Sequence, residues 1–384
     1  MTLIRKIKRF LDHTVLDKTF RYTFHYIYKC KNTFLQKKRV KTVNDVVIFC
    51  YGGMGDIIMT FPMITQLCRK FNVHVFIENK FNQLSTLLPE NCYFYYYSKK
   101  NLFSTLLGFR KKKIPNLLFI QKSPIFELVL FKKIMNVSAT IGFLYSHNDV
   151  NTLNLPQLGI KKKIINKLSG YEIIFQQIMR LSDPNSNPTK LYKKNNIFLT
   201  NKDFNLNFKY FTVSVSKDSN WEMGSIEPKE YYKIISEIYM RTKLTPVFLG
   251  KSEDSSKIHE VLNLIPKNFN YINLVGKTNL IDLIAIINKT EFTIANDNGI
   301  HHLSNLLKKK TITLFNFSSP LVYKWNNKNS LTLFKKKYSC MPCISKPKGP
   351  WDNIPFKCPY NIRCKDSLNA EDIINVFSKI KSSG

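Results

Sequence analysis

The chain has 384 residues, enough for two domains of ordinary size. Hydrophobic residues make up 44% and aromatic residues 13%, so the chain can bury sizeable cores and is not intrinsically disordered. The formal net charge of +33 predicts attraction to polyanions such as an anionic membrane, a phosphorylated substrate or a nucleic acid. We expect no nucleic-acid partner, because no dedicated nucleic-acid-binding motif accompanies the charge. Neither an apolar run of membrane-spanning length nor a signal-peptide core is found, so a membrane span and export are not expected.

Residues 1–42 form a basic extension. Leu3, Ile4 and Ile7 fall on one face of a predicted helix, with lysines and arginines beside them. Such a stretch can lie on an anionic bilayer, or it can pack on the body of the protein.

Residues 43–200 are predicted to form a first parallel α/β domain. It opens with a β-rich run at 46–49, a glycine-rich turn, a helical stretch at 57–70 containing Pro62, and a strand at 73–77. The turn matches neither the dinucleotide fingerprint nor a phosphate-binding P-loop. Gly53 and Gly55 can instead let a ligand approach the backbone. Asp56 then starts the helix, either as a dipole partner or as a functional carboxylate.

Later elements of this domain are less distinct. Strands are predicted at 117–120 and 139–143 and a helix at 171–181, and the polar loop at 183–188 marks the approach to the domain boundary.

Residues 201–333 repeat the alternation of strands and helices. Strands are predicted at 211–215, 246–249 and 270–274, a helix at 230–239, and a further helix capped by Asn279. Lys217 follows the first strand, and Glu253 and Asp254 follow the second, where acidic side chains can bind ribose hydroxyls. These repeated units predict two doubly wound parallel sheets that face each other across a cleft.

The stretch at 293–320 is the most informative. A short strand ends at Asp297, Asn298 and Gly299, and a helix containing His301 and His302 follows. Unpaired N–H groups at the start of a helix favour a phosphate. The alternative is an ordinary strand-to-helix connection with an Asn cap.

Residues 334–384 hold a cysteine cluster and a final helix that starts at Asn369. The cluster predicts either a structural Zn or Fe site or reduced structural thiols. Its members are Cys340, Cys343, Cys358 and Cys364.

In motif order and spacing, residues from about 43 to the end resemble glycosyltransferase family 9, the ADP-heptose:lipopolysaccharide heptosyltransferases, which have the GT-B fold. The motifs that carry the resemblance are Gly55-Asp56, Thr60-Phe61-Pro62, Ile141-Gly142-Phe143, the segment 273–280 (NLVGKTNL), the segment 296–303 (NDNGIHHL), Leu314-Phe315, Ser319-Pro320, and the cysteines of the tail.

The resemblance implies an inverting transfer that needs no catalytic cofactor, with Asp56 as the base for the acceptor hydroxyl. It places the acceptor near Gly53, Gly55 and Thr60. Donor-binding residues would be Lys217, Glu253, Asp254, Asp297, Asn298, Gly299 and His302. Two departures stand out: Asn298 replaces the family's Thr, and the family's basic signature in the second domain reads SIEP at 225–228.

Three functions follow as hypotheses. The first is transfer of a heptose or related sugar from an ADP-sugar to an anionic, lipid-linked lipopolysaccharide or lipooligosaccharide core, by a cytoplasmic protein peripheral to the inner face of the membrane. The second is a heptosyltransferase that modifies autotransporter adhesins and carries a cysteine-bound metal. The third is a basic nucleic-acid-binding or scaffold protein on a degenerate GT-B frame.

Overall fold

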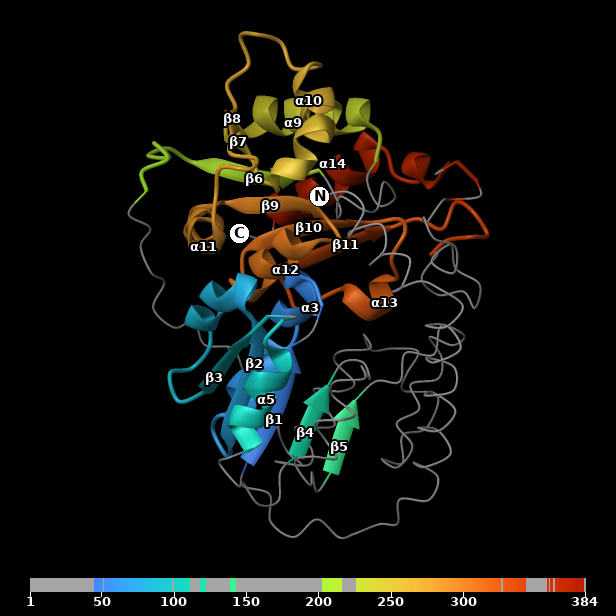
Figure 1. Ribbon diagram of the computed structural model, residues 1–384. Helices are drawn as coiled ribbons and strands as arrows, with labels where there is room; N and C mark the ends of the chain where they lie inside the picture. Colours follow the sequence, from blue (N-terminus) through green and yellow to red (C-terminus); the bar gives the residue numbers. More distant parts are fainter. Residues whose placement is uncertain are drawn as a thin grey trace, which may run out of the picture.

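A computed structural model describes residues 45–50, 52–98, 100–110, 118–121, 139–142, 202–215, 226–325, 327–342, 358, 360–361 and 363–382. Within them lie two parallel sheets, one below the other in Figure 1, with helices against their faces. The predictions for the basic extension and for a helix at 171–181 lie outside the described residues.

The first sheet has the strand order β3-β2-β1-β4-β5. Its strands are β1 (Asp45–Cys50), β2 (Asn72–Glu78), β3 (Tyr93–Tyr97), β4 (Leu118–Gln121) and β5 (Ala139–Gly142). Buried side chains fill β1 from Val46 to Cys50, as expected of a central parallel strand covered on both faces. The edge strand β3 is not predicted from the sequence.

Helices α3 (Met54–Ile58) and α4 (Phe61–Leu67) replace the single helical stretch expected at 57–70. The break falls at Met59 and Thr60, and Pro62 lies in the first turn of α4, where its missing N–H is not needed. The 3₁₀ segment η1 (Asn79–Leu87) and α5 (Leu102–Arg110) complete the described helical segments of this domain.

The second sheet has the order β11-β10-β9-β6-β7-β8. Its strands are β6 (Tyr210–Ser214), β7 (Thr245–Phe248), β8 (Ile272–Asn273), β9 (Phe292–Asn296), β10 (Lys310–Phe315) and β11 (Ser330–Phe334). The associated helical segments are α9 (Pro228–Thr242), η3 (Ser252–Asp254), α10 (Ser255–Leu262), α11 (Leu280–Lys289), α12 (Gly299–Leu306), α13 (Pro320–Tyr323), η6 (Arg363–Asp366) and α14 (Ala370–Ser382). The doubly wound parallel sheets that the sequence predicts are therefore present, with β11 as an unpredicted edge strand.

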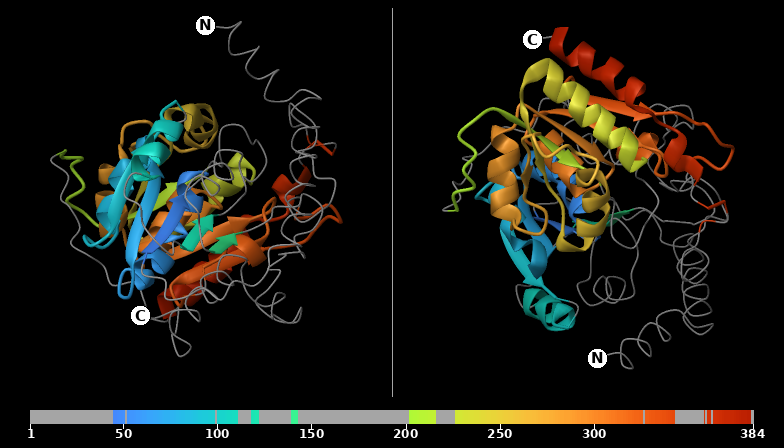
Figure 2. Two further views of the ribbon diagram at one scale, coloured as in Figure 1. Left: turned by 60° about the horizontal axis from the view of Figure 1, so that its bottom comes forward. Right: turned by 90° about the horizontal axis from the view of Figure 1, so that it is seen from above.

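The C-terminal helix α14 packs on the second domain (Figure 2). Asn369 caps it as predicted, since its side-chain oxygen accepts from the Asp372 N–H at 3.0 Å. Phe377 packs on Phe292 of β9 with ring centroids 5.1 Å apart, so this helix adds to the core of that domain.

The two domains meet through α3 against α12 and through η1 against α11 (Figure 1). One apolar cluster includes Ile57 and Leu84 from the first domain and Ile287 and Leu303 from the second. Among the described residues, no helix combines the length and the apolar character that crossing a membrane requires.

Candidate functional site

Two glycine-containing turns face each other where the domains meet. The first follows β1 and leads into α3; the second follows β9 and leads into α12. A Cβ atom built on Gly55 would lie 2.3 Å from Cδ2 of His302, and one on Gly299 would lie 2.2 Å from Cε of Met54. Gly55 is therefore required by the close approach of the His302 ring, whereas at Gly299 the flexible end of the Met54 side chain would have to move. The carboxyl ends of two central parallel strands meet at this point, which is where such folds bind ligands.

Asp56 lies in the first turn of α3 and is half-buried. Its Oδ2 accepts a hydrogen bond from the Gly53 N–H at 3.0 Å. Gly52 has a φ of +124°, and a Cβ there would lie 2.5 Å from the same oxygen. The glycine turn thus wraps closely around the carboxylate and fixes its direction. The side chain of the predicted acceptor residue Thr60 donates instead to the Ile57 carbonyl at 2.6 Å, at the break between α3 and α4.

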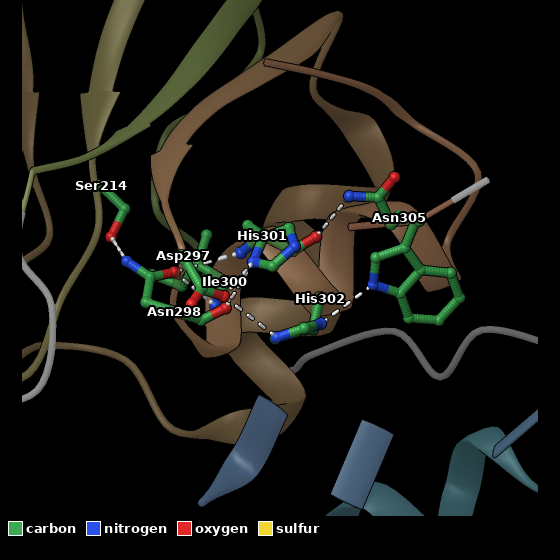
Figure 3. A network of polar contacts seen from close by, with 8 residues as sticks. Ser214, Asp297, Asn298, Ile300, His301, His302 and Asn305 are labelled. Atoms are coloured by element: carbon green, nitrogen blue, oxygen red, sulfur yellow. Dashed lines mark hydrogen bonds and ion pairs between the residues drawn. The ribbon is translucent and has the colours of Figure 1, made fainter. Parts of the chain in front are cut away.

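Asn298 caps α12, as the alternative reading of this turn predicts. Its side-chain oxygen accepts from the N–H groups of Ile300 at 2.9 Å and His301 at 3.2 Å (Figure 3). Its side-chain amide donates to Ser214 Oγ at 2.9 Å, at the end of β6. Two of the N–H groups expected to face a phosphate are therefore satisfied by the cap in this structure.

Asn296, the last residue of β9, fixes the turn from the other side. It is fully buried, and its amide donates to the Val215 carbonyl at 2.7 Å. Its side-chain oxygen accepts from the Tyr231 hydroxyl at 2.5 Å. Because Asn296 and Asn298 both contact the end of β6, the turn between them is held rigidly against its neighbouring strand.

Asp297 lies between two histidines. Its Oδ1 is 3.6 Å from Nδ1 of His301 and 3.5 Å from Nε2 of His302 (Figure 3). Nδ1 of His301 also lies 3.1 Å from the Asn298 carbonyl oxygen, so this nitrogen carries the proton. Nδ1 of His302 lies 2.9 Å from Nε1 of Trp325. An indole nitrogen only donates, so Nδ1 of His302 is the acceptor and its proton is on Nε2, toward Asp297.

Asp297, His301 and His302 are residue types that bind metal ions, and their three ligand atoms all lie within 4.8 Å of one another. The protonation pattern does not fit a metal, because both nitrogens that face the carboxylate carry protons. A metal on Nε2 of His302 would move the proton to Nδ1, against the Trp325 N–H. The trio is therefore a carboxylate that lies between two imidazole N–H groups.

Two further predicted donor residues, Glu253 and Asp254, lie in η3 after β7 of the second domain. Asp254 is buried, and its Oδ2 accepts from the Lys251 N–H at 2.9 Å, so it caps the segment after β7. Glu253 is exposed and 3.3 Å from the Ser252 hydroxyl. Lys217 lies outside the described residues.

Three of the four clustered cysteines lie within the described residues. Cys364 is buried, whereas Cys340 and Cys358 are partly exposed. Burial raises the pKa of the Cys364 thiol to about 11, and the neighbouring Cys358 and Cys340 thiols raise it further. The three thiols thus lie in one region, but their sulfurs do not all lie within 4.8 Å of one another. Cys343 lies outside the described residues, so the predicted Zn or Fe site stays a prediction.

Trp325 is the site residue that sequence reasoning missed. It follows α13, 23 positions beyond His302, and no motif marks it. The sequence shows only a tryptophan shortly after the Ser319-Pro320 motif, and this does not indicate that the tryptophan contacts His302.

Two doubly wound domains that meet at two glycine turns have the architecture of the GT-B fold. Residues 227–350 match glycosyltransferase family 9 (heptosyltransferase). The match covers less than half of the chain and agrees with the resemblance that its motifs predict.

A curated relative is lipooligosaccharide heptosyltransferase 2 of Campylobacter jejuni, 29% identical over 140 residues that make up 35% of this chain and 39% of the relative. The chain therefore aligns with well under half of that protein's length.

Solved structures share the fold at low identity. The family 9 glycosyltransferase of Veillonella parvula has a TM-score of 0.66 and 14% identity, covering 90% of this chain and all of that one. The E. coli heptosyltransferase WaaC with ADP-2-deoxy-2-fluoro heptose has a TM-score of 0.55 and 13% identity, covering 87% and 99%. The iron-containing dodecameric glycosyltransferase TibC of enterotoxigenic E. coli has a TM-score of 0.54 and 14% identity, covering 90% and 77%. These likenesses confirm the predicted GT-B fold.

Proposed function

We propose that the protein is a glycosyltransferase that moves a heptose, or a closely related sugar, from an ADP-sugar to a lipooligosaccharide or lipopolysaccharide core. The observation that carries this proposal is the close approach of Gly55, the residue before Asp56, to His302 of the second domain, in a chain whose residues 227–350 match family 9. The names of the Campylobacter relative and of the ADP-heptose analogue complex support the choice of donor and acceptor class.

In the proposed reaction, an acceptor hydroxyl attacks the anomeric carbon and the ADP leaves with the electron pair of the broken bond. Asp56 accepts the proton of the attacking hydroxyl. The glycine turn supports this role, because the Gly53 N–H donates to the carboxylate and directs it. The amino end of α12 lies across the domain junction from Asp56 and stabilises the negative charge of the departing diphosphate. For this, the side-chain oxygen of Asn298 shares the N–H groups of Ile300 and His301 with the diphosphate or moves away from them.

Asp56→Asn is expected to lower kcat by about a hundredfold or more, in the range usual for loss of a general base, while donor binding is retained. The measurements are sugar transfer to a truncated core acceptor and thermal shift with ADP-, UDP- and GDP-sugars. Glu260→Gln is a matched control, because Glu260 is an exposed carboxylate on α10. Unchanged turnover in Asp56→Asn contradicts the assigned base. If no ADP-sugar raises the melting temperature of the protein, the assignment of an ADP-sugar as donor is wrong.

A second candidate is transfer to a protein acceptor by a metal-containing relative of TibC. The observation that favours it is the gathering of Cys340, Cys358 and Cys364 in one region of the tail. Under this candidate, anaerobically purified protein contains Zn or Fe in stoichiometric amount, and Cys364→Ser removes it. Metal-free protein with full activity eliminates this candidate and leaves reduced structural thiols.

A further inference from the structure

We infer that Trp325 is a positioning residue for the transfer reaction and acts by fixing the tautomer of His302. This inference rests on the proposed function, but its structural half can be measured without any substrate. It concerns the hydrogen bond from Trp325, in the segment after α13, to His302 of α12, which none of the sequence motifs predicts.

The chemistry of the two rings decides the direction of the hydrogen bond. The Trp325 N–H can only donate, and it lies 2.9 Å from Nδ1 of His302. His302 must therefore keep a lone pair on Nδ1 and carry its proton on Nε2. The other tautomer, with its proton on Nδ1, would lose this bond, so the contact with Trp325 favours the Nε2–H tautomer.

The position of His302 makes this tautomer matter. Nε2 faces Asp297 at 3.5 Å, and the ring carbon Cδ2 lies against Gly55 of the opposite domain, one residue before Asp56. The ring is almost fully buried, so a reversed tautomer would place a lone pair against the Asp297 carboxylate without water to separate them. By holding Nε2–H toward Asp297, Trp325 keeps that carboxylate and the start of α12 in one arrangement beside the glycine turn.

The segment that carries Trp325 is itself anchored along α12. Asn327 donates to the side-chain oxygen of Asn305 at 3.4 Å, and Asn329 donates to the Lys308 carbonyl at 2.7 Å. These bonds lie at the far end of the helix from His302. The segment after α13 thus runs alongside α12 and delivers the indole to its first turn.

The test replaces Trp325 by Phe, which removes the N–H and keeps most of the bulk. Nitrogen-15 NMR of the imidazoles, with His302→Asn to assign the signals, should show the Nε2–H tautomer in the unaltered protein and a mixture of tautomers in Trp325→Phe. We expect kcat to fall about tenfold, with KM for the ADP-sugar changed by less than twofold, because a ring no longer held in place is felt most in the transition state.

Asn329→Ala is the matched control, since it removes an anchor of the same segment while leaving the indole in place. It should retain the tautomer and more than half of kcat. A single Nε2–H tautomer together with normal kcat in Trp325→Phe would overturn the inference. If the unaltered protein transfers no sugar, the proposed function fails, whereas the tautomer spectra still decide whether Trp325 controls His302.

Discussion

At the scale of single residues, close approach explains the glycines better than any phosphate-binding motif. The Gly55 site has no room for a methyl group because the His302 ring from the opposite domain lies against it. Gly53 and Gly55 were predicted to let a ligand approach the backbone. In this structure the His302 ring of the second domain lies against Gly55, and the Asp56 side chain lies against Gly52. The same turn therefore shapes the site and joins the domains.

Gly55→Ala is expected to lower the free energy of unfolding by about 1–3 kcal/mol, because the added methyl group forces the His302 ring or the α3 turn to move. It should also lower sugar transfer at least tenfold, since both turns of the site are displaced. Urea unfolding and the transfer assay measure the two effects.

Gly108→Ala provides the control for the glycine experiment. Gly108 lies within α5, and a Cβ there meets nothing within 4 Å. The change should leave stability unaltered or raise it by up to about 1 kcal/mol, because alanine favours a helix. Equal effects of the two substitutions would refute the close-approach argument.

At the scale of elements, one carboxylate of the second domain supports the docking of the C-terminal helix beside the apolar contacts of that helix. Oε2 of Glu230, in the first turn of α9, accepts from the Ala370 N–H at 2.9 Å, and Oε1 pairs with Lys233 at 3.0 Å. Burial by itself raises the pKa of Glu230, but these two partners outweigh burial and hold the pKa below its ordinary value of 4.5. The ionised form therefore stabilises the docking of α14.

Glu230→Gln is expected to lower the free energy of unfolding by about 1 kcal/mol near neutral pH, through loss of the charge-assisted bond. Since the folded-state pKa is depressed, this stabilisation is complete above the unfolded-state pKa of 4.5 and disappears as the pH falls through the folded value. The difference between the two proteins in urea unfolding should therefore shrink toward acid pH. A difference that grows on acidification would contradict the assigned direction.

Glu237→Gln is the matched control at this scale. Glu237 lies on the same helix and pairs with Arg241 at 2.6 Å, with 41% of its side chain exposed. An exposed pair of this type contributes little, so we expect less than about 0.5 kcal/mol and little dependence on pH.

At the scale of the whole molecule, the net charge of +33 suits an anionic acceptor and an anionic surface. We propose that the protein acts at the inner face of the cytoplasmic membrane as a peripheral protein. Co-sedimentation with vesicles containing an anionic phospholipid should be strong at low ionic strength and fall severalfold at 0.5 M salt, because screening removes the attraction. Neutral vesicles are the control, and equal binding to both kinds of vesicle would refute the proposal.

Sequence alone determined the buried strands, the cap residues and the glycine turns, because these depend on local periodicity and local hydrogen bonding. The runs at β1 and β9 and the caps Asn279 and Asn369 were all predicted from nearby residues. The resemblance to family 9 followed from the order and spacing of such segments, and residues 227–350 match that family. The edge strands β3 and β11 were not predicted, because edge strands are specified by pairing with a distant neighbour.

Only the tertiary structure decided which partners meet across the chain. The contact of Gly55 with His302 spans the two domains, and the bond from Trp325 to His302 depends on how the segment after α13 runs along α12. The tautomer of His302 follows from the contact with Trp325. No residue type or local spacing carries that information, because the position of a proton on an imidazole is set by whichever donor or acceptor the fold brings to the other nitrogen.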